Sequence, residues 1–308
     1  MLHALATAAL LPLAGPLAPD TLRRDWVAAE AVLVAHFDLA ALAQSKLGSA
    51  LLESEHVGGL AELTAWTEEH GIELGRDLRG MTVYVSPGED AQPVLILSTS
   101  AKAEGLLEAL PEGADHWTKT VEGRLLHSID YDGERLYAHV VEVGRDARAI
   151  VLSPVVEELL GAATCVEGKA QSLAGSGSPL AALEPRKGSY AFVAVSDLAR
   201  LPATDLASEM LKEAVGFTID VGEDEGHVVA EGSVTGKSEE AARDIAEAGQ
   251  GLVALARIIA GHEDVSEEVR AGRLGFLDSI RISSKGRTIR AAIRLPVDAI
   301  AALLEEHL

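Results

Sequence analysis

Two stretches far apart in this chain share an ungapped pattern, and this repetition constrains the fold more than any other feature. Residues 31–42 read AVLVAHFDLAAL and residues 190–201 read YAFVAVSDLARL. In each, a short apolar run rich in β-branched residues predicts a buried strand, and an aspartate follows where a helix needs its N-cap. The shared positions are Val34, Ala35, Asp38, Leu39, Ala40 and Leu42 in the first stretch and Val193, Ala194, Asp197, Leu198, Ala199 and Leu201 in the second. The chain therefore predicts a strand-to-helix unit that occurs twice.

The elements after each stretch recur in the same order. Residues 80–85 (GMTVYV) and 216–221 (GFTIDV) each begin a predicted hairpin, and each hairpin leads into a predicted helix. We expect an α+β fold of two diverged repeats, each an antiparallel sheet with helices packed on one face. The two sheets can be separate or form halves of one extended sheet. The predicted units are 19–165 and 188–308, joined by a linker rich in Gly, Ser and Pro at 166–187.

Three further strands are predicted at 117–121, 124–131 and 135–143, because Glu122-Gly123 and Asp132-Gly133 are good two-residue turns. Ser153-Pro154 has the order of an N-cap followed by the first helical residue. A long helix near the end of the chain carries apolar residues at steps of three and four, which predicts a stripe facing the core. The stripe consists of Ala241, Ile245, Ala248, Leu252, Leu255 and Ile259.

The charge of the chain bears on its partners. Lys and Arg total 26 against 48 Asp and Glu, which gives a net charge of −22. This field repels a phosphate backbone and an anionic lipid surface, so we expect no nucleic-acid partner. Residues 1–18 have the length and apolar character of a secretion signal, and the sequence predicts an exported protein, periplasmic or extracellular. The alternative is that residues 1–18 are a short apolar segment packed on the fold. No later segment has the length of a membrane helix, so no integral membrane segment is expected in the mature chain.

Several of these elements resemble a known family. The strand ending in Asp38-Leu39, a helix with a Ser-x-Leu-Gly-x-x-Leu-Leu element and the later strand around Thr82-Val83-Tyr84 are similar to a family of exported bacterial proteins of unknown function that is abundant in planctomycetes. The helical element consists of Ser45, Leu47, Gly48, Leu51 and Leu52. The stretch from Val151 to Leu173 resembles the same family. The resemblance implies export and the duplicated α+β layout, and it supplies no catalytic residue.

One string imitates a phosphate-binding loop. Residues 232–238 read GSVTGKS, but a P-loop needs four residues between its glycines and this string has three. Ser238 is better interpreted as an N-cap, with Glu239 and Glu240 in the first helical turn. The sequence therefore favours a strand-to-helix junction over nucleotide binding.

The histidines and the single cysteine are candidates for a metal site or for catalysis. The predicted turns place Thr118 and Ala138 opposite His127, so that His116 and His127 share a face of the sheet and His139 lies on the other. This arrangement favours exposed strand histidines over a zinc site. His36 is interpreted as a buried, hydrogen-bonded histidine in preference to a general base. Cys165 is interpreted as a small buried apolar residue in preference to a nucleophile.

Acidic clusters are candidates for calcium. Asp220, Glu223, Asp224 and Glu225 lack the alternating spacing of an EF-hand loop, and the string from Asp130 fails the same test. We interpret both as solvated turns. No catalytic, cofactor-binding or metal-binding residue is assigned, and no cofactor is expected.

The expected function is a non-enzymatic, exported binding or scaffold protein. It would recognise an unknown protein or apolar ligand through a concave sheet or through the surface between the two units. Two alternatives stay open. The first is a protein that binds an apolar ligand or lipid between a curved sheet and the long helix. The second is a divergent hydrolase.

Overall fold

The computed structural model describes residues 20–53, 67, 69–107, 115–131, 133–201, 213–262 and 266–300. Most of the helix predicted between Gly59 and Gly71 lies outside these residues, as does the whole predicted signal at 1–18.

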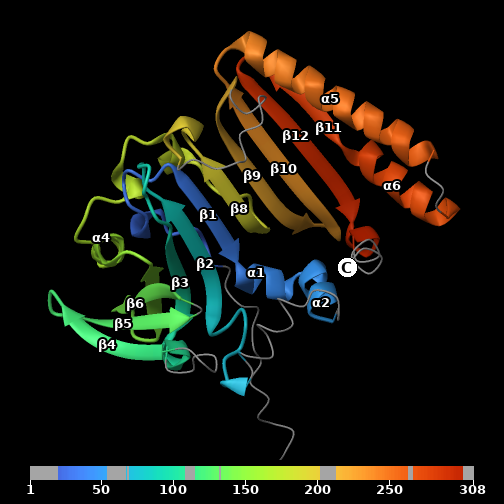
Figure 1. The fold of residues 1–308 in the computed structure, drawn as a ribbon. Helices are drawn as coiled ribbons and strands as arrows, with labels where there is room; N and C mark the ends of the chain where they lie inside the picture. Colours follow the sequence, from blue (N-terminus) through green and yellow to red (C-terminus); the bar gives the residue numbers. More distant parts are fainter. Residues whose placement is uncertain are drawn as a thin grey trace, which may run out of the picture.

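The protein is an α+β structure built on one sheet of twelve strands, in which every neighbouring pair is antiparallel. In sequence order the strands are β1 (Leu33–Asp38), β2 (Leu78–Val85), β3 (Val94–Ser100), β4 (Asp115–Val121), β5 (Arg124–Tyr131), β6 (Glu134–Glu142), β7 (Ala147–Ser153), β8 (Ser189–Val195), β9 (Ala214–Asp224), β10 (His227–Gly236), β11 (Arg281–Lys285) and β12 (Thr288–Pro296). Across the sheet their order is β11-β12-β10-β9-β8-β1-β2-β3-β7-β6-β5-β4. Of the two layouts expected from the sequence, the chain therefore forms the single extended sheet (Figure 1).

Helices cover both sides of this sheet. They are α1 (Leu39–Gln44), α2 (Lys46–Glu53), α4 (Val156–Val166), α5 (Glu239–His262) and α6 (Glu267–Ser279), with 3-10 turns η1 (Arg24–Trp26), η2 (Ala101–Leu107), η3 (Leu173–Gly175), η4 (Pro179–Ala182) and η5 (Leu198–Arg200). Figure 1 shows α5 and α6 along one end of the sheet and α4 toward the other. Strand β1 carries apolar residues on both faces, but only alternate residues of it are fully buried.

The two sides of the sheet can be told apart by register, because residues directly opposed in an antiparallel pair point to the same side. On one side, Val34 lies between Tyr84 and Ala194, and α4 packs here through Leu159 and Ala162. We call this side the α4 face. On the other side, Leu33 lies opposite Val195, and this row continues to Val234, against which α5 packs. We call this side the α5 face.

Local signals in the sequence set several boundaries correctly. Asp38 caps α1 by accepting a hydrogen bond from the Ala41 amide at 2.7 Å, and Ser238 accepts one from the Ala241 amide at 3.0 Å at the start of α5. The prediction for Ser153-Pro154 was wrong by two residues. The Ser153 hydroxyl accepts from the Val155 amide in a turn, and α4 begins at Val156.

The hairpins between β4, β5 and β6 confirm the predicted register. Glu122 and Gly123 have φ values of 50° and 78°, as a tight two-residue turn requires, and Gly133 has a φ of 79°. Thr118 and Ala138 both lie opposite His127. The side on which each strand histidine lies therefore follows from the turns alone.

The predicted core stripe of the long helix was wrong over most of its length. Leu252, Leu255 and Ile259 are 58%, 52% and 52% exposed. The helix is held instead by small residues, since Ala242 and Ala246 pack on Ile289 of the sheet. The apolar stripe thus runs along the flank of α5, beside its line of contact with the sheet.

The stretch predicted as a linker, 166–187, packs on the fold. Leu173 and Leu180 are 1% and 2% exposed, and both belong to the core on the α4 face. The Leu173 amide also donates to the Val27 carbonyl at 2.8 Å.

One ion pair in this half of the fold gives a pH-dependent prediction. Arg124 donates to both carboxylate oxygens of Glu167, at 3.3 and 2.9 Å, and Lys169 lies 2.8 Å from the same group. These cations, Arg124 first, lower the pKa of Glu167 from 4.5 to about 2. Stabilisation by a carboxyl with a lowered pKa is present above its unfolded value and is lost as the pH falls through the folded one. Because solvent reaches the pair, we expect Glu167→Gln to cost about 1–2 kcal/mol at pH 7.

Urea denaturation at pH 7 and near pH 2 measures this effect, and the difference between Glu167→Gln and the native protein should shrink at the lower pH. Glu240→Gln is the matched control, because its exposed carboxylate lies 3.9 Å from Arg243. If Glu167→Gln lowered the free energy of unfolding equally at both pH values, the assigned role of the ion pair would be contradicted.

Candidate functional sites on the two faces of the sheet

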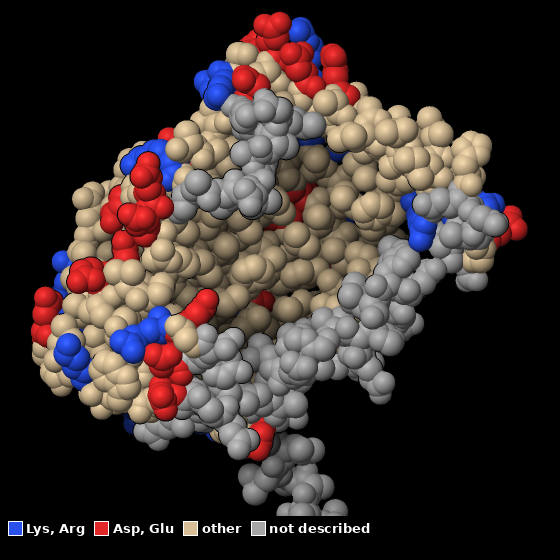
Figure 2. All heavy atoms as spheres, viewed as in Figure 1, with Lys and Arg blue, Asp and Glu red and all other residues tan. Residues whose placement is uncertain are grey.

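The α5 face has a broad hollow near the middle of the sheet. Figure 2 is viewed from the side of α1 and α5, and it shows a depression in which few charged residues are visible. The strands beneath it place apolar side chains on this face at every second position. These residues are half-buried or exposed: Leu33, Ala35 and Phe37 of β1, Ala191 and Val193 of β8, and Phe217 and Ile219 of β9. Ile219 is 45% exposed, an unusual position for a large apolar residue in the middle of a sheet.

The flank of α5 forms one wall of this hollow. Gln250 donates to the Ile282 carbonyl and Arg257 to the Leu277 carbonyl, so these two residues point toward β11 and α6. Since an α-helix turns by about 100° per residue, Leu252, Leu255 and Ile259 leave the helix about 140–200° away from them. They therefore face the β9 side, where the apolar floor lies. We call this wall and this floor together the apolar hollow. It is the candidate site on the α5 face.

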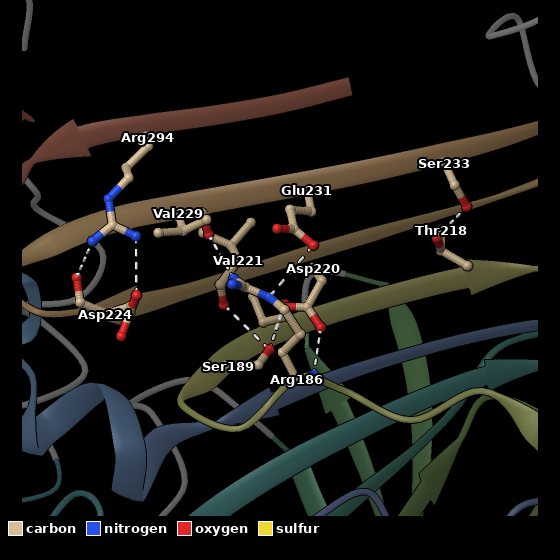
Figure 3. Close-up of polar contacts among 11 residues, drawn as sticks. Arg186, Ser189, Thr218, Asp220, Val221, Asp224, Val229, Glu231, Ser233 and Arg294 are labelled. Carbon is tan, nitrogen blue, oxygen red and sulfur yellow. Dashed lines mark hydrogen bonds and ion pairs between the residues drawn. The ribbon is translucent and has the colours of Figure 1, made fainter. Parts of the chain in front are cut away.

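The α4 face carries a polar groove where the sheet is not covered by α4. Arg186, which precedes β8, crosses over β9 and β10 (Figure 3). Its amide donates to Asp220 at 2.7 Å, its Nε to the same carboxylate at 3.3 Å, and its Nη2 to the Val229 carbonyl at 3.1 Å. Glu231, directly opposite Asp220 in register, lies 3.9 Å from Arg186. The groove has a volume of about 520 Å³.

The prediction that Asp220 belongs to a solvated turn was wrong. Strand β9 continues to Asp224, and the turn is formed by Glu225 and Gly226, with φ values of 50° and 74°. Asp220 is consequently a strand residue that is only 7% exposed. Such burial is tolerated because Arg186 supplies a charged partner with two hydrogen bonds. Since a guanidinium does not give up its proton near neutral pH, this pair is not an acid–base dyad.

A second cavity of about 560 Å³ adjoins the groove and shares Glu184 and Arg186 with it. His36 lines this cavity and is 3% exposed. Its Nδ1 lies 2.9 Å from the Thr82 hydroxyl and its Nε2 2.9 Å from the Asp20 carbonyl. Both ring nitrogens are engaged, which confirms the buried, hydrogen-bonded interpretation of His36.

The strand histidines lie as the turns predicted. His116 and His127 stack with ring centroids 5.2 Å apart and with Nε2 and Nδ1 separated by 3.1 Å. His139 instead bonds through Nδ1 to the Leu125 carbonyl at 2.9 Å. Within the described parts of the chain, no three His, Cys, Asp or Glu residues gather as a metal site would require.

Two other candidate sites have structural roles. Cys165 is 4% exposed within the core on the α4 face, and burial raises the pKa of its thiol. This confirms its interpretation as a buried apolar residue. The glycine-containing string at 232–238 runs along β10 and into the cap of α5, as the sequence indicated.

Neither surface is readily recognised from the sequence. The apolar hollow is made of residues whose alternation is that of any half-buried strand, so only their common exposure distinguishes them. Arg186 and Asp220 are separated by 34 positions. The one available signal for the groove was the concentration of cations in the last hairpin.

The structure itself defines the class of the protein. It is an α+β protein with a large antiparallel sheet. No protein-family model matches the chain, and no curated protein matches it. Among solved structures, crystal form III of TP0453 is similar over 92% of this chain and 97% of that one, with 9% identity and a TM-score of 0.46. Crystal form IV of TP0453 covers 94% of this chain and 97% of its own, with 11% identity and a TM-score of 0.43. Likeness at this level transfers no function. None of the described helices combines the length and the apolar character that a membrane span requires.

Proposed function

We propose that this is a non-enzymatic binding protein that holds an aliphatic ligand in the apolar hollow. The observation that carries the proposal is the shared exposure of large apolar side chains on two separate elements, Ile219 on the floor and Leu252 and Leu255 on the wall. Exposed apolar area of this kind is costly in water unless something covers it. A ligand that covers this apolar area removes it from water, and this burial contributes favourably to the free energy of binding.

The chemistry of the lining indicates the class of ligand. Aromatic residues make up 4% of the chain, and most of the lining residues are aliphatic. The surface therefore suits an acyl or alkyl chain better than a stacked planar ring. With a net charge of −22, a neutral ligand is favoured over an anionic one.

The proposal includes a duplicated origin and export. Strands β1 and β8 lie side by side at the centre of the sheet, with β2-β3 following outward on one side and β9-β10 on the other. This order is what two diverged repeats would give if they paired through their first strands. Export rests on residues 1–18 and on the family resemblance. Sequencing the N-terminus of the mature protein from the native cell tests it.

Displacement of the neutral apolar fluorophore N-phenyl-1-naphthylamine tests the proposed binding. A long-chain alcohol or monoacylglycerol should displace the bound fluorophore saturably from the native protein. We expect Ile219→Asp and Leu252→Asp each to weaken binding by about tenfold or more, because each places a charge against the ligand.

Ile258→Asp is the matched control for the wall. Ile258 is 61% exposed on the same helix but leaves it on the side away from the sheet. The affinity of the Ile258→Asp variant for the fluorophore should stay within about twofold of the native value. Failure of the native protein to bind the fluorophore, or equal losses in Leu252→Asp and Ile258→Asp, would refute the hollow as the binding site.

A further inference from the structure

The last hairpin has a charge opposite to that of the rest of the chain. Residues 281–296, which form β11 and β12, read RISSKGRTIRAAIRLP and contain five cations and no acid. The whole chain, by contrast, carries a net charge of −22. A local field of positive sign on such a molecule concentrates anions at one place on the surface.

The register brings two of these cations into the polar groove of the α4 face. Arg290 lies directly between Ser233 of β10 and Ser283 of β11. In the next row, Ala292 lies between Glu231 and Arg281. Both arginines line the groove, and the small side chain of Ala292 leaves room between them and the acidic end.

Two other arginines on the α4 face already have partners. Arg186 bonds to Asp220, and Arg294 lies 2.9 Å from Asp224. Arg281 donates to two main-chain carbonyls, those of Asp278 and Ile280, and has no carboxylate partner among the described residues. For Arg290, no hydrogen bond or ion pair is found within the described part of the chain.

Protection of a sheet edge does not account for this arrangement. Charged residues on an edge strand discourage pairing with another molecule, and this can explain Arg281 on β11. Strand β12, however, is paired on both sides, with β10 and with β11. Arg290 is therefore an exposed residue of an interior strand, where edge protection gives no reason for a charge.

We propose that the groove is a second binding site, independent of the apolar hollow, that takes the phosphate group of a small ligand between Arg281 and Arg290. Guanidinium groups bind phosphate oxygens through paired, charge-assisted hydrogen bonds. Ser283 and Ser233 flank Arg290 in the register, and the Ser283 hydroxyl can supply a further donor. The Ser233 hydroxyl lies 2.7 Å from that of Thr218 and is already engaged in a hydrogen bond (Figure 3). Glu231 at the far end disfavours a second anionic group there, so the ligand carries its charge at one end.

Isothermal titration of the full-length protein with inorganic phosphate and with glycerol 3-phosphate tests this site. Saturable binding is expected, and Arg290→Gln and Arg281→Gln should each raise Kd by about tenfold or more. Ala292→Leu should also weaken binding, because it fills the space while retaining every charge. Tighter binding of glycerol 3-phosphate would identify a phosphate ester as the ligand, and equal affinities would identify the free ion.

Arg243→Gln is the matched control. It removes one exposed positive charge from α5, outside the groove, and should leave Kd within about twofold of the native value. No saturable heat from either probe, or the same change in Arg243→Gln as in Arg290→Gln, would overturn the site. The outcome is separable from that of the fluorophore experiment, since none of these variants touches the apolar hollow.

Discussion

Gly222→Ala is expected to destabilise the fold by about 2–3 kcal/mol. A Cβ at this position would lie 2.3 Å from the Gly188 carbonyl oxygen, and main-chain atoms cannot move aside as a flexible side chain can. Gly188 has a φ of 83°, and its carbonyl accepts the Glu223 amide at 3.2 Å. The segment that carries Arg186 is thus fastened to β9 at the point where the new methyl group would be inserted.

Urea denaturation monitored by circular dichroism gives the change in the free energy of unfolding, with an unchanged m-value as the sign that two-state behaviour persists. Gly272→Ala is the matched control, because no heavy atom lies within 4 Å of a Cβ built there in α6. Replacing a helical glycine by alanine should stabilise the protein by about 0.5–1 kcal/mol. A Gly222→Ala protein as stable as the native one would show that the Arg186 segment does not rest on β9.

The parts of the fold that the sequence predicts correctly depend on local interactions. Asp38 and Ser238 bond to amides three residues away, and Glu122-Gly123 sets the register of its hairpin by its own backbone conformation. A cap or a tight turn has a recognisable signature because all its atoms come from a few adjacent residues.

The parts that were missed, or that the sequence left open between two layouts, depend on residues brought together from a distance. Joining β1 to β8 makes one sheet of the two predicted units, and nothing in either strand specifies that pairing. Apolar residues at steps of three and four likewise identify an apolar stripe on a helix. They do not indicate whether the stripe contacts the sheet or lies beside it, as in α5. Asp220 shows the same limit, since its burial depends on Arg186 in another segment.

The two candidate sites differ in how far the sequence could have indicated them. The hollow follows from exposure alone, and exposure is a property of the assembled sheet. The sequence shows five cations and no acid within residues 281–296, but the significance of these cations depends on the register of β11 and β12. Only the pairing of Arg290 with Ser233 and Ser283 puts a charged group among hydroxyls in a groove.

Leu173→Ala is expected to lower the free energy of unfolding by about 3 kcal/mol, within the range of 2–5 kcal/mol typical of buried leucines. The substitution tests the predicted linker at 166–187, because side chains of a solvated connection contribute almost nothing to stability. Leu173 is 1% exposed and packs in the same core as Trp26 and Leu159. Removing three of its carbon atoms leaves a cavity that residues from three segments would have to fill.

Leu125→Ala provides the comparison, since Leu125 is 51% exposed on β5 and its truncation should change stability by less than about 0.5 kcal/mol. Equal and small effects of the two substitutions in urea denaturation would mean that 166–187 is a linker in solution. A large effect confined to Leu173→Ala would mean that this segment joins the two halves of the sheet through a common core. In that case the surfaces proposed here, one on each face, are carried by a single folded unit.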